Sequence, residues 1–143
     1  MKVKLLIAKE TLSYLPLPLY SSRVPAGFPS PADDYLEGTL DLNEYLVKHP
    51  SSTFFARASG LSMVNAGIMD EALLVVDRSL DPQHEDIVIA IVNGELTCKI
   101  LDLKTSLLRA ANPSYPPIPL TEELDCIIQG VVTHVVNKLC SHS

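Results

Sequence analysis

The feature that most constrains the fold is the dipeptide Asn93-Gly94, which separates two strand-sized apolar stretches, residues 87–92 and 95–101. Asparagine and glycine adopt the positive φ angles of a type I′ turn at little cost, so this region predicts a β-hairpin. Gly130 is expected to mark a bend or bulge in a later strand. Further stretches with the length and composition of strands are 53–58, 73–77, 107–110 and 126–136. The chain is therefore expected to form a compact, mostly antiparallel β fold.

One short helix is expected before these strands. Asp41 is a favourable N-cap residue, Glu44 follows it by three residues, and Pro50 would end the helix after about two turns. Further along the chain, residues 112–119 contain four prolines and are expected to form a rigid loop. The helix and the loop thus interrupt a fold that is otherwise built from strands.

The first 26 residues differ in composition from the rest of the chain. They carry four basic residues and one acidic residue, a net charge of +3, whereas residues 27–143 carry 7 basic and 16 acidic residues, a net charge of -9. Five of the eleven prolines lie within residues 1–31, and proline favours extended chain over helix. Residues 2–5 alternate in polarity, as a short strand would. We therefore expect a cleavable N-terminal arm over residues 1–26, a linker over 27–40 and a folded domain over 41–140.

Composition argues against several classes of protein. With 143 residues, 47% of them hydrophobic, the chain is long enough for one domain with a real core. Its net charge of -6 argues against direct nucleic-acid binding, which relies on lysine and arginine. The apolar runs are too short for a signal peptide or a membrane span, so a soluble, cytoplasmic protein is expected. A disulfide framework, a zinc site or another cofactor is not expected, because no CxxC spacing occurs among Cys98, Cys126 and Cys140.

Ser62 is the first candidate for covalent chemistry. It lies in the turn after the stretch 53–58, but not in a GxSxG motif, because Val64 rather than glycine follows Met63. A serine in a turn usually has only a structural role. The sequence shows no evident triad pattern with any of the four histidines, His49, His84, His134 and His142.

Lys99 is the more interesting candidate for a base. Strand alternation places it with Glu95 and Thr97 on the polar face of the stretch 95–101, where an exposed lysine is the simpler interpretation. The catalytic interpretation requires another segment to shield this lysine from water, because burial disfavours a charged ammonium group. A neutral amine can then take the proton of a serine nucleophile, whereas an arginine cannot lose its proton.

The N-terminal arm contains a dipeptide of small residues, Ala26-Gly27, where a peptide bond could approach a nucleophile closely. Together with Ser62 and Lys99, it resembles the UmuD family, self-cleaving mutagenesis proteins related to the C-terminal domain of the LexA repressor. The resemblance covers about residues 20–138. It rests on residues 28–35 (FPSPADDY), 41–43 (DLN), 49–51 (HPS), 58–60 (ASG) with Ser62-Met63, 86–90 (DIVIA), 94–95 (GE) with Thr97 and Lys99, 130–132 (GVV) and 134–136 (HVV).

The resemblance implies a compact fold of the LexA and signal-peptidase type, mostly β, with one short helix and an extended N-terminal arm. It implies that Ser62 is the nucleophile, that Lys99 is the general base, and that the protein cuts its own Ala26–Gly27 bond. In this family, cleavage belongs to the DNA-damage (SOS) response and is stimulated by RecA filaments on single-stranded DNA. The shortened protein, as a homodimer, then joins a UmuC-like polymerase for error-prone translesion synthesis.

Three positions depart from the family pattern. Leu61 stands beside the nucleophile where aspartate is common, Glu71 lies in a turn that is commonly Asp-Gly-Asp, and Glu85 replaces a usual glycine. Leu61 could alter the cleavage rate or the response to a partner, and the other two concern turn geometry. None of the three removes a reacting group.

A non-catalytic alternative is a dimeric β binding module that regulates a UmuC-like polymerase. The joint presence of Ser62, Lys99 and Ala26-Gly27 favours the peptidase, because an inactive relative has no need to keep all of them. A LexA-type repressor is not expected, because the 26 proline-rich residues before the cleavage bond are too few for a helix-turn-helix domain. A signal peptidase is not expected without a membrane anchor.

Overall fold

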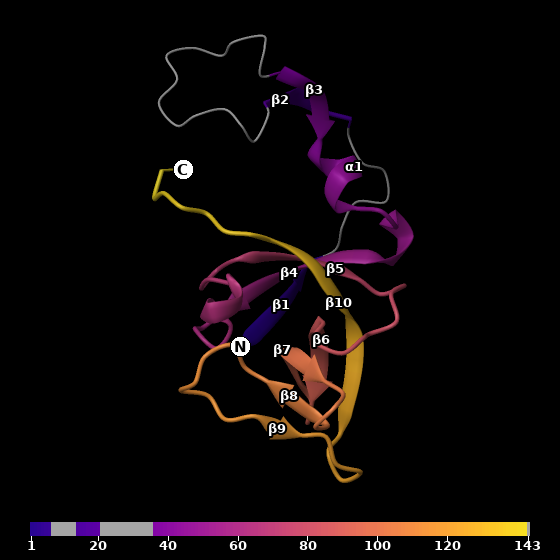
Figure 1. The fold of residues 1–143 in the computed structure, drawn as a ribbon, viewed down its shortest axis with the longest axis vertical. Helices are drawn as coiled ribbons and strands as arrows, with labels where there is room; N and C mark the ends of the chain where they lie inside the picture. The colour runs from indigo at the N-terminus through magenta and orange to yellow at the C-terminus, as the bar shows by residue number, and fades with distance from the viewer. Residues whose placement is uncertain (7–13, 21–35, 143) are drawn as a thin grey trace.

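Strands predominate in the computed structural model, which describes residues 1–6, 14–20 and 36–142 (Figure 1). The mostly β fold with one short α-helix that the sequence predicts is confirmed. No helix in the described residues is long and apolar enough to cross a membrane. The elements in chain order are β1 (Lys2–Leu6), β2 (Pro16–Tyr20), β3 (Leu36–Asp41), α1 (Leu42–Leu46), the 3-10 turn η2 (Pro50–Ser52), β4 (Thr53–Ser59), the 3-10 turn η3 (Val64–Ala66), β5 (Leu73–Asp77), β6 (Ile87–Val92), β7 (Glu95–Asp102), β8 (Leu107–Arg109), β9 (Ile118–Pro119) and β10 (Cys126–Val136).

The main sheet is antiparallel, with the strand order β1-β4-β5-β10-β6-β7-β8-β9. β1 pairs along its whole length with β4 and, at Lys2 opposite Thr97, also with β7, so the sheet closes on itself. β10 comes last in the chain but lies between β5 and β6 (Figure 1). This closure places the end of β4 and the middle of β7 on either side of one residue, Lys2.

The hairpin of β6 and β7 forms as predicted. Val92 pairs with Glu95, and the two residues between them have positive φ angles, 49° at Asn93 and 84° at Gly94. Those angles are the ones a type I′ turn requires. The hairpin therefore fixes the register of the strand that carries Lys99, which pairs with Val88.

β10 is irregular at the predicted glycine. The register of its pairing with β6 shifts between Ile128 and Gly130. A Cβ atom on Gly130 would lie 2.8 Å from Val76 Cγ1 and 3.1 Å from the carbonyl oxygen of Asp77. Glycine is thus required here by close packing against β5, and the predicted bulge is confirmed.

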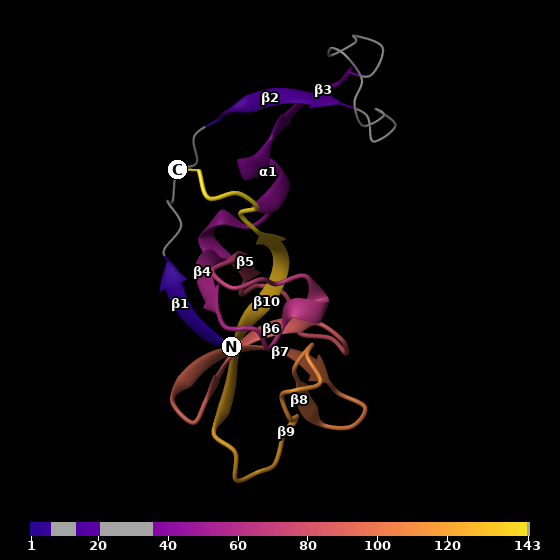
Figure 2. The same ribbon diagram turned by 90° about the vertical axis from the view of Figure 1, so that its left-hand side faces the viewer.

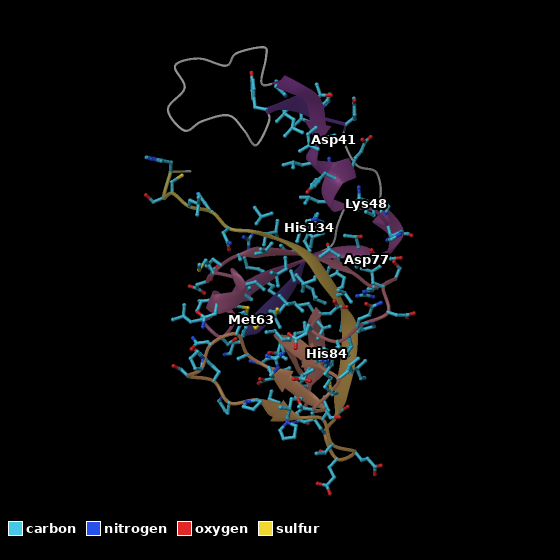
Figure 3. The ribbon with its side chains drawn as sticks, viewed as in Figure 1. Asp41, Lys48, Met63, Asp77, His84 and His134 are labelled. Carbon is cyan, nitrogen blue, oxygen red and sulfur yellow. The ribbon has the colours of Figure 1, made fainter. Side chains whose placement is uncertain are left out.

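Two groups of buried side chains fill the closed sheet. The larger is built around Met63, Leu74, Ile89 and Cys98, with Met1 and Val3 packed against it. The smaller consists of Val88, Leu101, Leu108 and Val131. A fully buried aliphatic side chain of this kind stabilises the fold by roughly 1.5–3 kcal/mol. Met63 lies inside the body of the sheet (Figure 3), so its burial also fixes the turn that carries the neighbouring Ser62.

The helix and the proline-rich loop differ from the sequence prediction. α1 ends at Leu46 and does not continue to Pro50, which instead begins η2. The N-cap is confirmed, since the Asp41 carboxylate accepts a hydrogen bond from the backbone N–H of Asn43 at 3.2 Å. The loop over 112–119 is not wholly irregular, because its last two residues pair with β8 as the short strand β9.

The expected N-terminal arm contributes strands to two different sheets. β1 belongs to the main sheet, whereas β2 pairs with β3 in a separate two-stranded sheet (Figure 2). The proposed cleavage dipeptide, Ala26-Gly27, lies outside the described residues. The structure therefore describes the candidate catalytic residues but not the bond that they would cut.

Candidate active site

Ser62 lies in a tight turn that follows β4. The turn begins at Gly60, where φ is 100° and the backbone N–H donates to the Asp70 carboxylate at 2.7 Å. Ser62 is only 1% exposed, and the side chain of Met63 is fully buried beside it. The neighbouring Leu61, in contrast, is 54% exposed. The turn thus carries the serine inward and its apolar neighbour outward.

Lys99 is buried on β7, with only 6% of its surface exposed. The simpler interpretation of the sequence, an exposed lysine on a polar face, is therefore wrong. Two elements supply the shielding that the catalytic interpretation requires. β1 pairs with β7 two residues away, at Thr97, and the ring of Tyr115 lies 5.9 Å from the Lys99 ammonium nitrogen.

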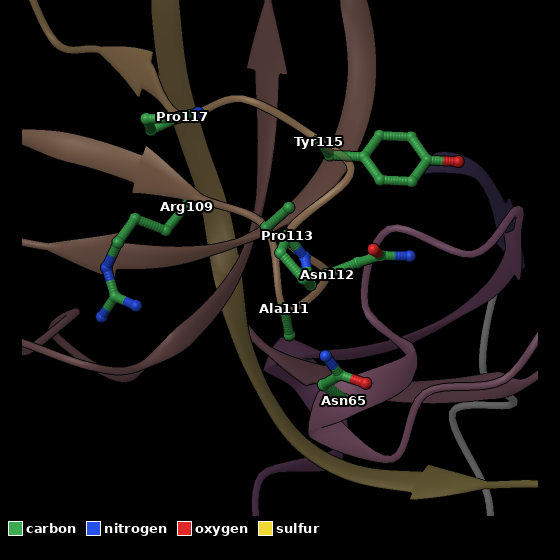
Figure 4. Close-up of a pocket in the computed structure, with 8 residues that line it drawn as sticks. Asn65, Arg109, Ala111, Asn112, Pro113, Tyr115 and Pro117 are labelled. Atoms are coloured by element: carbon green, nitrogen blue, oxygen red, sulfur yellow. The ribbon is translucent and has the colours of Figure 1, made fainter.

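The loop after β8 contacts both the serine turn and the lysine. The side-chain amide of Asn112 donates a hydrogen bond to the carbonyl oxygen of Leu61 at 2.9 Å. The backbone N–H of Asn65 donates to the carbonyl oxygen of Ala111, also at 2.9 Å. Figure 4 shows the ring of Tyr115, on this loop, pointing away from Arg109 at the end of β8. One segment thus fixes the turn before Ser62 and covers Lys99. Sequence reasoning did not predict this role of Asn112 and Tyr115. The available signal was the aromatic residue Tyr115 within a proline-rich stretch.

A pocket of about 430 Å³ lies under this loop, between Arg109 and Tyr115 (Figure 4). Neither Ser62 nor Lys99 lines it. Its floor is formed by Asn65 and Ala111, the pair that ties the loop to η3. The pocket is therefore a neighbour of the candidate catalytic residues and does not contain them.

The hydroxyl of Ser62 has no hydrogen-bond partner among the described residues. Lys99 therefore does not hydrogen-bond it in this structure. A buried polar atom without a partner is costly and uncommon, and such atoms often belong to functional sites. In resting enzymes, catalytic hydrogen bonds are often long and tighten only when substrate binds.

The amino group of Met1 lies near Lys99. Its nitrogen is 3.5 Å from the Thr97 hydroxyl oxygen. Burial, and then the charge of the neighbouring Lys99, lower the pKa of this amino group below its ordinary value. The start of β1 and the candidate base are therefore close enough for their charges to interact.

A second cluster has the residue types of a catalytic triad but not its geometry. The His49 ring nitrogen Nδ1 lies 2.5 Å from Asp77 Oδ2 and 3.2 Å from Ser79 Oγ. In a triad, the serine and the carboxylate contact opposite ring nitrogens. Burial raises the pKa of the Asp77 carboxyl, but hydrogen bonds from Ser79 and His49 outweigh this effect and hold it below its ordinary value. We assign this cluster a structural role at the end of β5 (Figure 3).

Cys98, the cysteine beside Lys99, shows no sign of being a metal ligand or a thiol nucleophile. No group of three or more metal-binding side chains occurs in the part of the chain that the structure describes. Cys98 is buried in the core, and burial raises the pKa of its thiol to about 12. A thiol with so high a pKa is not reactive, since the thiolate is the nucleophile.

Two departures from the family pattern coincide with unusual backbone angles. Glu71 has a φ of 67° and Glu85 a φ of 72°, both in the left-handed region that favours glycine. These are the two positions where the sequence comparison expects glycine. The turn geometry is therefore kept although the glycines are absent.

Comparison with known proteins decides the family. Residues 18–133 match the Peptidase S24-like family. The chain belongs to this family. The protein ImpA of Escherichia coli is 47% identical over 127 residues, which cover 85% of this chain and 83% of ImpA. SamA of Salmonella typhimurium (strain LT2) is 49% identical over 122 residues, 85% of each chain. MucA of Escherichia coli is 44% identical over 120 residues, 82% of each chain.

These similarities confirm the resemblance to the UmuD proteins. The chain is a member of a family of serine peptidases. Its function lies in SOS mutagenesis, as the sequence predicts.

Proposed function

We propose that this protein is a self-cleaving serine peptidase in which Ser62 is the nucleophile, Lys99 is the general base, and Ala26–Gly27 is the bond that is cut. The observation that carries the proposal is the burial of both side chains beside the point where β1 bridges β4 and β7. A general base must be unprotonated when it acts, and both side chains are shielded from bulk water.

The proposed reaction has two steps. In the first, the Ser62 oxygen attacks the carbonyl carbon of Ala26 while the Lys99 amine takes the hydroxyl proton. The C–N bond to Gly27 then breaks, and Lys99 returns the proton to the leaving amine. In the second step, Lys99 takes a proton from water, the resulting hydroxide attacks the ester on Ser62, and the serine regains its proton. One water is consumed, and the products are residues 1–26 and residues 27–143.

Proton transfer requires a change from the structure described above. The two side chains must come within about 3 Å of one another before the proton can pass, whereas Ser62 is unpartnered among the described residues. We therefore interpret this arrangement as a resting state, in which both side chains are buried but do not hydrogen-bond to one another.

The proposed stimulus and partners follow the resemblance to the UmuD proteins. RecA filaments on single-stranded DNA would stimulate cleavage, and the product would act in the cytoplasm as a homodimer with a UmuC-like polymerase. The net charge of residues 27–143, -9, supports contact with DNA through these partners and not directly.

The proposal is tested by incubating the purified protein with RecA filaments on single-stranded DNA and sequencing the N-terminus of any product. We expect a product that begins at Gly27, and none from Ser62→Ala. The matched control is Ser114→Ala, which removes an exposed hydroxyl from the neighbouring loop and should be cut normally. Cleavage of Ser62→Ala, or at another bond, would contradict the proposal. No cleavage of any form would favour the non-catalytic binding module.

A further inference from the structure

β1 fills the strand position between the two strands that lead to the candidate catalytic residues. Lys2 pairs with Ser59, three residues before Ser62, and with Thr97, two residues before Lys99. In Figures 1 and 2, β1 lies beside β4 with its N-terminal end toward β7. A peptide bond that is to be cut must bring its carbonyl carbon to about 3–3.5 Å from the nucleophile. A substrate segment that approached through the strand position between β4 and β7 would therefore have to displace β1.

The start of β1 also touches the candidate base. The Met1 amino group lies near Lys99 and 3.5 Å from the Thr97 hydroxyl oxygen. Met1 and Val3 pack against the same core group as Met63, the residue after Ser62. The strand is thus anchored next to both candidate catalytic residues.

β1 is held firmly by one neighbour and weakly by the other. Five residue pairs join it to β4, but only one joins it to β7. Beyond that pair, a pocket of about 270 Å³ lies between β1 and β7, lined by Lys2, Val3, Glu95 and Leu96. Lys2, Lys4 and Leu5 are exposed. The contacts on the β7 side are few, as expected of a strand that can leave its place.

We propose that β1 is an internal inhibitor strand. It occupies the strand position between β4 and β7 that the segment containing Ala26–Gly27 would need for cleavage, and it thereby limits the rate of self-cleavage. This inference rests on the proposed function. Extended peptides bind sheet edges through backbone hydrogen bonds, and one edge cannot pair with two strands at once. The observed cleavage rate is then reduced by the small fraction of molecules in which β1 is released.

A reversible disulfide tests the inhibitor strand. Lys4 pairs with Arg57 of β4, and both side chains are exposed. Opposed residues of antiparallel strands lie within the distance that a disulfide spans. We would make Lys4→Cys with Arg57→Cys in a Cys140→Ser background, since Cys140 is the exposed native thiol. Self-cleavage at alkaline pH should be slower by about tenfold or more in the oxidised protein than in the reduced protein.

The matched controls are Lys4→Cys alone and Arg57→Cys alone in the same background. Neither can form the lock, so oxidation should leave both rates unchanged. Equal rates for the oxidised and reduced double variant would overturn the inhibitor strand and leave the proposed function standing. Failure of every form to cut, oxidised or reduced, would overturn both.

A second variant tests the same inference in the opposite direction. Val3→Asp places a charge on the side of β1 that packs against the core and should release the strand, so cleavage should become faster by about tenfold. Lys4→Asp places the same charge on the exposed side and should change the rate little. A Val3→Asp rate no higher than that of Lys4→Asp would contradict the inhibitor strand. Thermal unfolding of both variants in a Ser62→Ala background checks that the domain stays folded.

Discussion

Glu71 holds a backbone conformation that suits glycine better than glutamate. Its φ is 67°, its side chain is exposed, and its backbone N–H donates to the carbonyl oxygen of Ala58 at 2.8 Å. Left-handed conformations cost non-glycine residues about 1–2 kcal/mol. Glu71→Gly should therefore stabilise the protein by roughly 1 kcal/mol, measured by urea unfolding in a Ser62→Ala background.

Glu85→Gly is the control for this prediction at the residue scale. Glu85 has a similar φ, 72°, but its carboxylate also binds Arg109 at 2.5 Å. Glu85→Gly relieves the backbone strain but removes the ion pair with Arg109. The gain in the free energy of unfolding should therefore be smaller than for Glu71→Gly. A loss of stability in Glu71→Gly would show that the backbone at this turn is not strained.

At the residue scale, sequence reasoning proposed the candidate catalytic residues but missed the residues that contact them. Ser62 and Lys99 were predicted from residue type and from the order of the motifs, and both prove to be buried. The contacts of Asn112 with Leu61 and of Tyr115 with Lys99 were not predicted. They join residues distant in the chain, and no local pattern encodes such a contact.

At the scale of elements, the tight turn between β7 and β8 is held by one carboxylate. Asp102 Oδ1 accepts from the backbone N–H groups of Lys104 and Thr105, and Oδ2 from Arg109 Nε, each at 3.0 Å. These bonds, that of Thr105 first, lower the pKa of Asp102 to about 2, from an ordinary value of about 3.9. Because the charged form is favoured in the folded state, this stabilisation is present above about pH 4 and lost as the pH falls toward 2.

Asp102→Asn should therefore lower the melting temperature at neutral pH and flatten its decline between pH 4 and pH 2. Thermal unfolding across this range, in a Ser62→Ala background, is the measurement. The control is Asp81→Asn, which changes an exposed carboxylate. If the melting temperature falls as steeply in Asp102→Asn as in the protein that keeps Asp102, other carboxylates govern acid unfolding.

The strands themselves were predictable to different degrees. The β6–β7 hairpin is encoded by two adjacent residues, Asn93 and Gly94, and its bounds were predicted closely. β1 alternates in polarity, but its partner β4 begins more than 45 residues later in the chain. A short alternating stretch does not specify which sheet edge it will join. The insertion of β1 between β4 and β7 was for this reason visible only in the structure.

At the scale of the whole molecule, the closure of the sheet and the proposed chemistry depend on the same strand, β1. β1 completes the closed sheet through Lys2 and also lies beside the candidate catalytic residues. Removing this strand from its place would open the sheet edge at that point. The same contact that completes the fold would thus keep the peptidase at rest, and cleavage within the arm would separate β1 covalently from the domain that carries Ser62 and Lys99.

The central claim is that Ser62 and Lys99 cut the chain at Ala26–Gly27, and an intact-mass time course at a series of alkaline pH values tests it most directly. The unmutated protein should yield a fragment that begins at Gly27, at a rate that rises with pH because only an unprotonated amine can act as the base. Ser62→Ala should yield none, and Lys99→Ala should be slower by about a hundredfold or more. Lys104→Ala, at an exposed lysine, should match the unmutated protein. Cleavage of Lys99→Ala at the unmutated rate, or a rate that does not change with pH, would contradict the account.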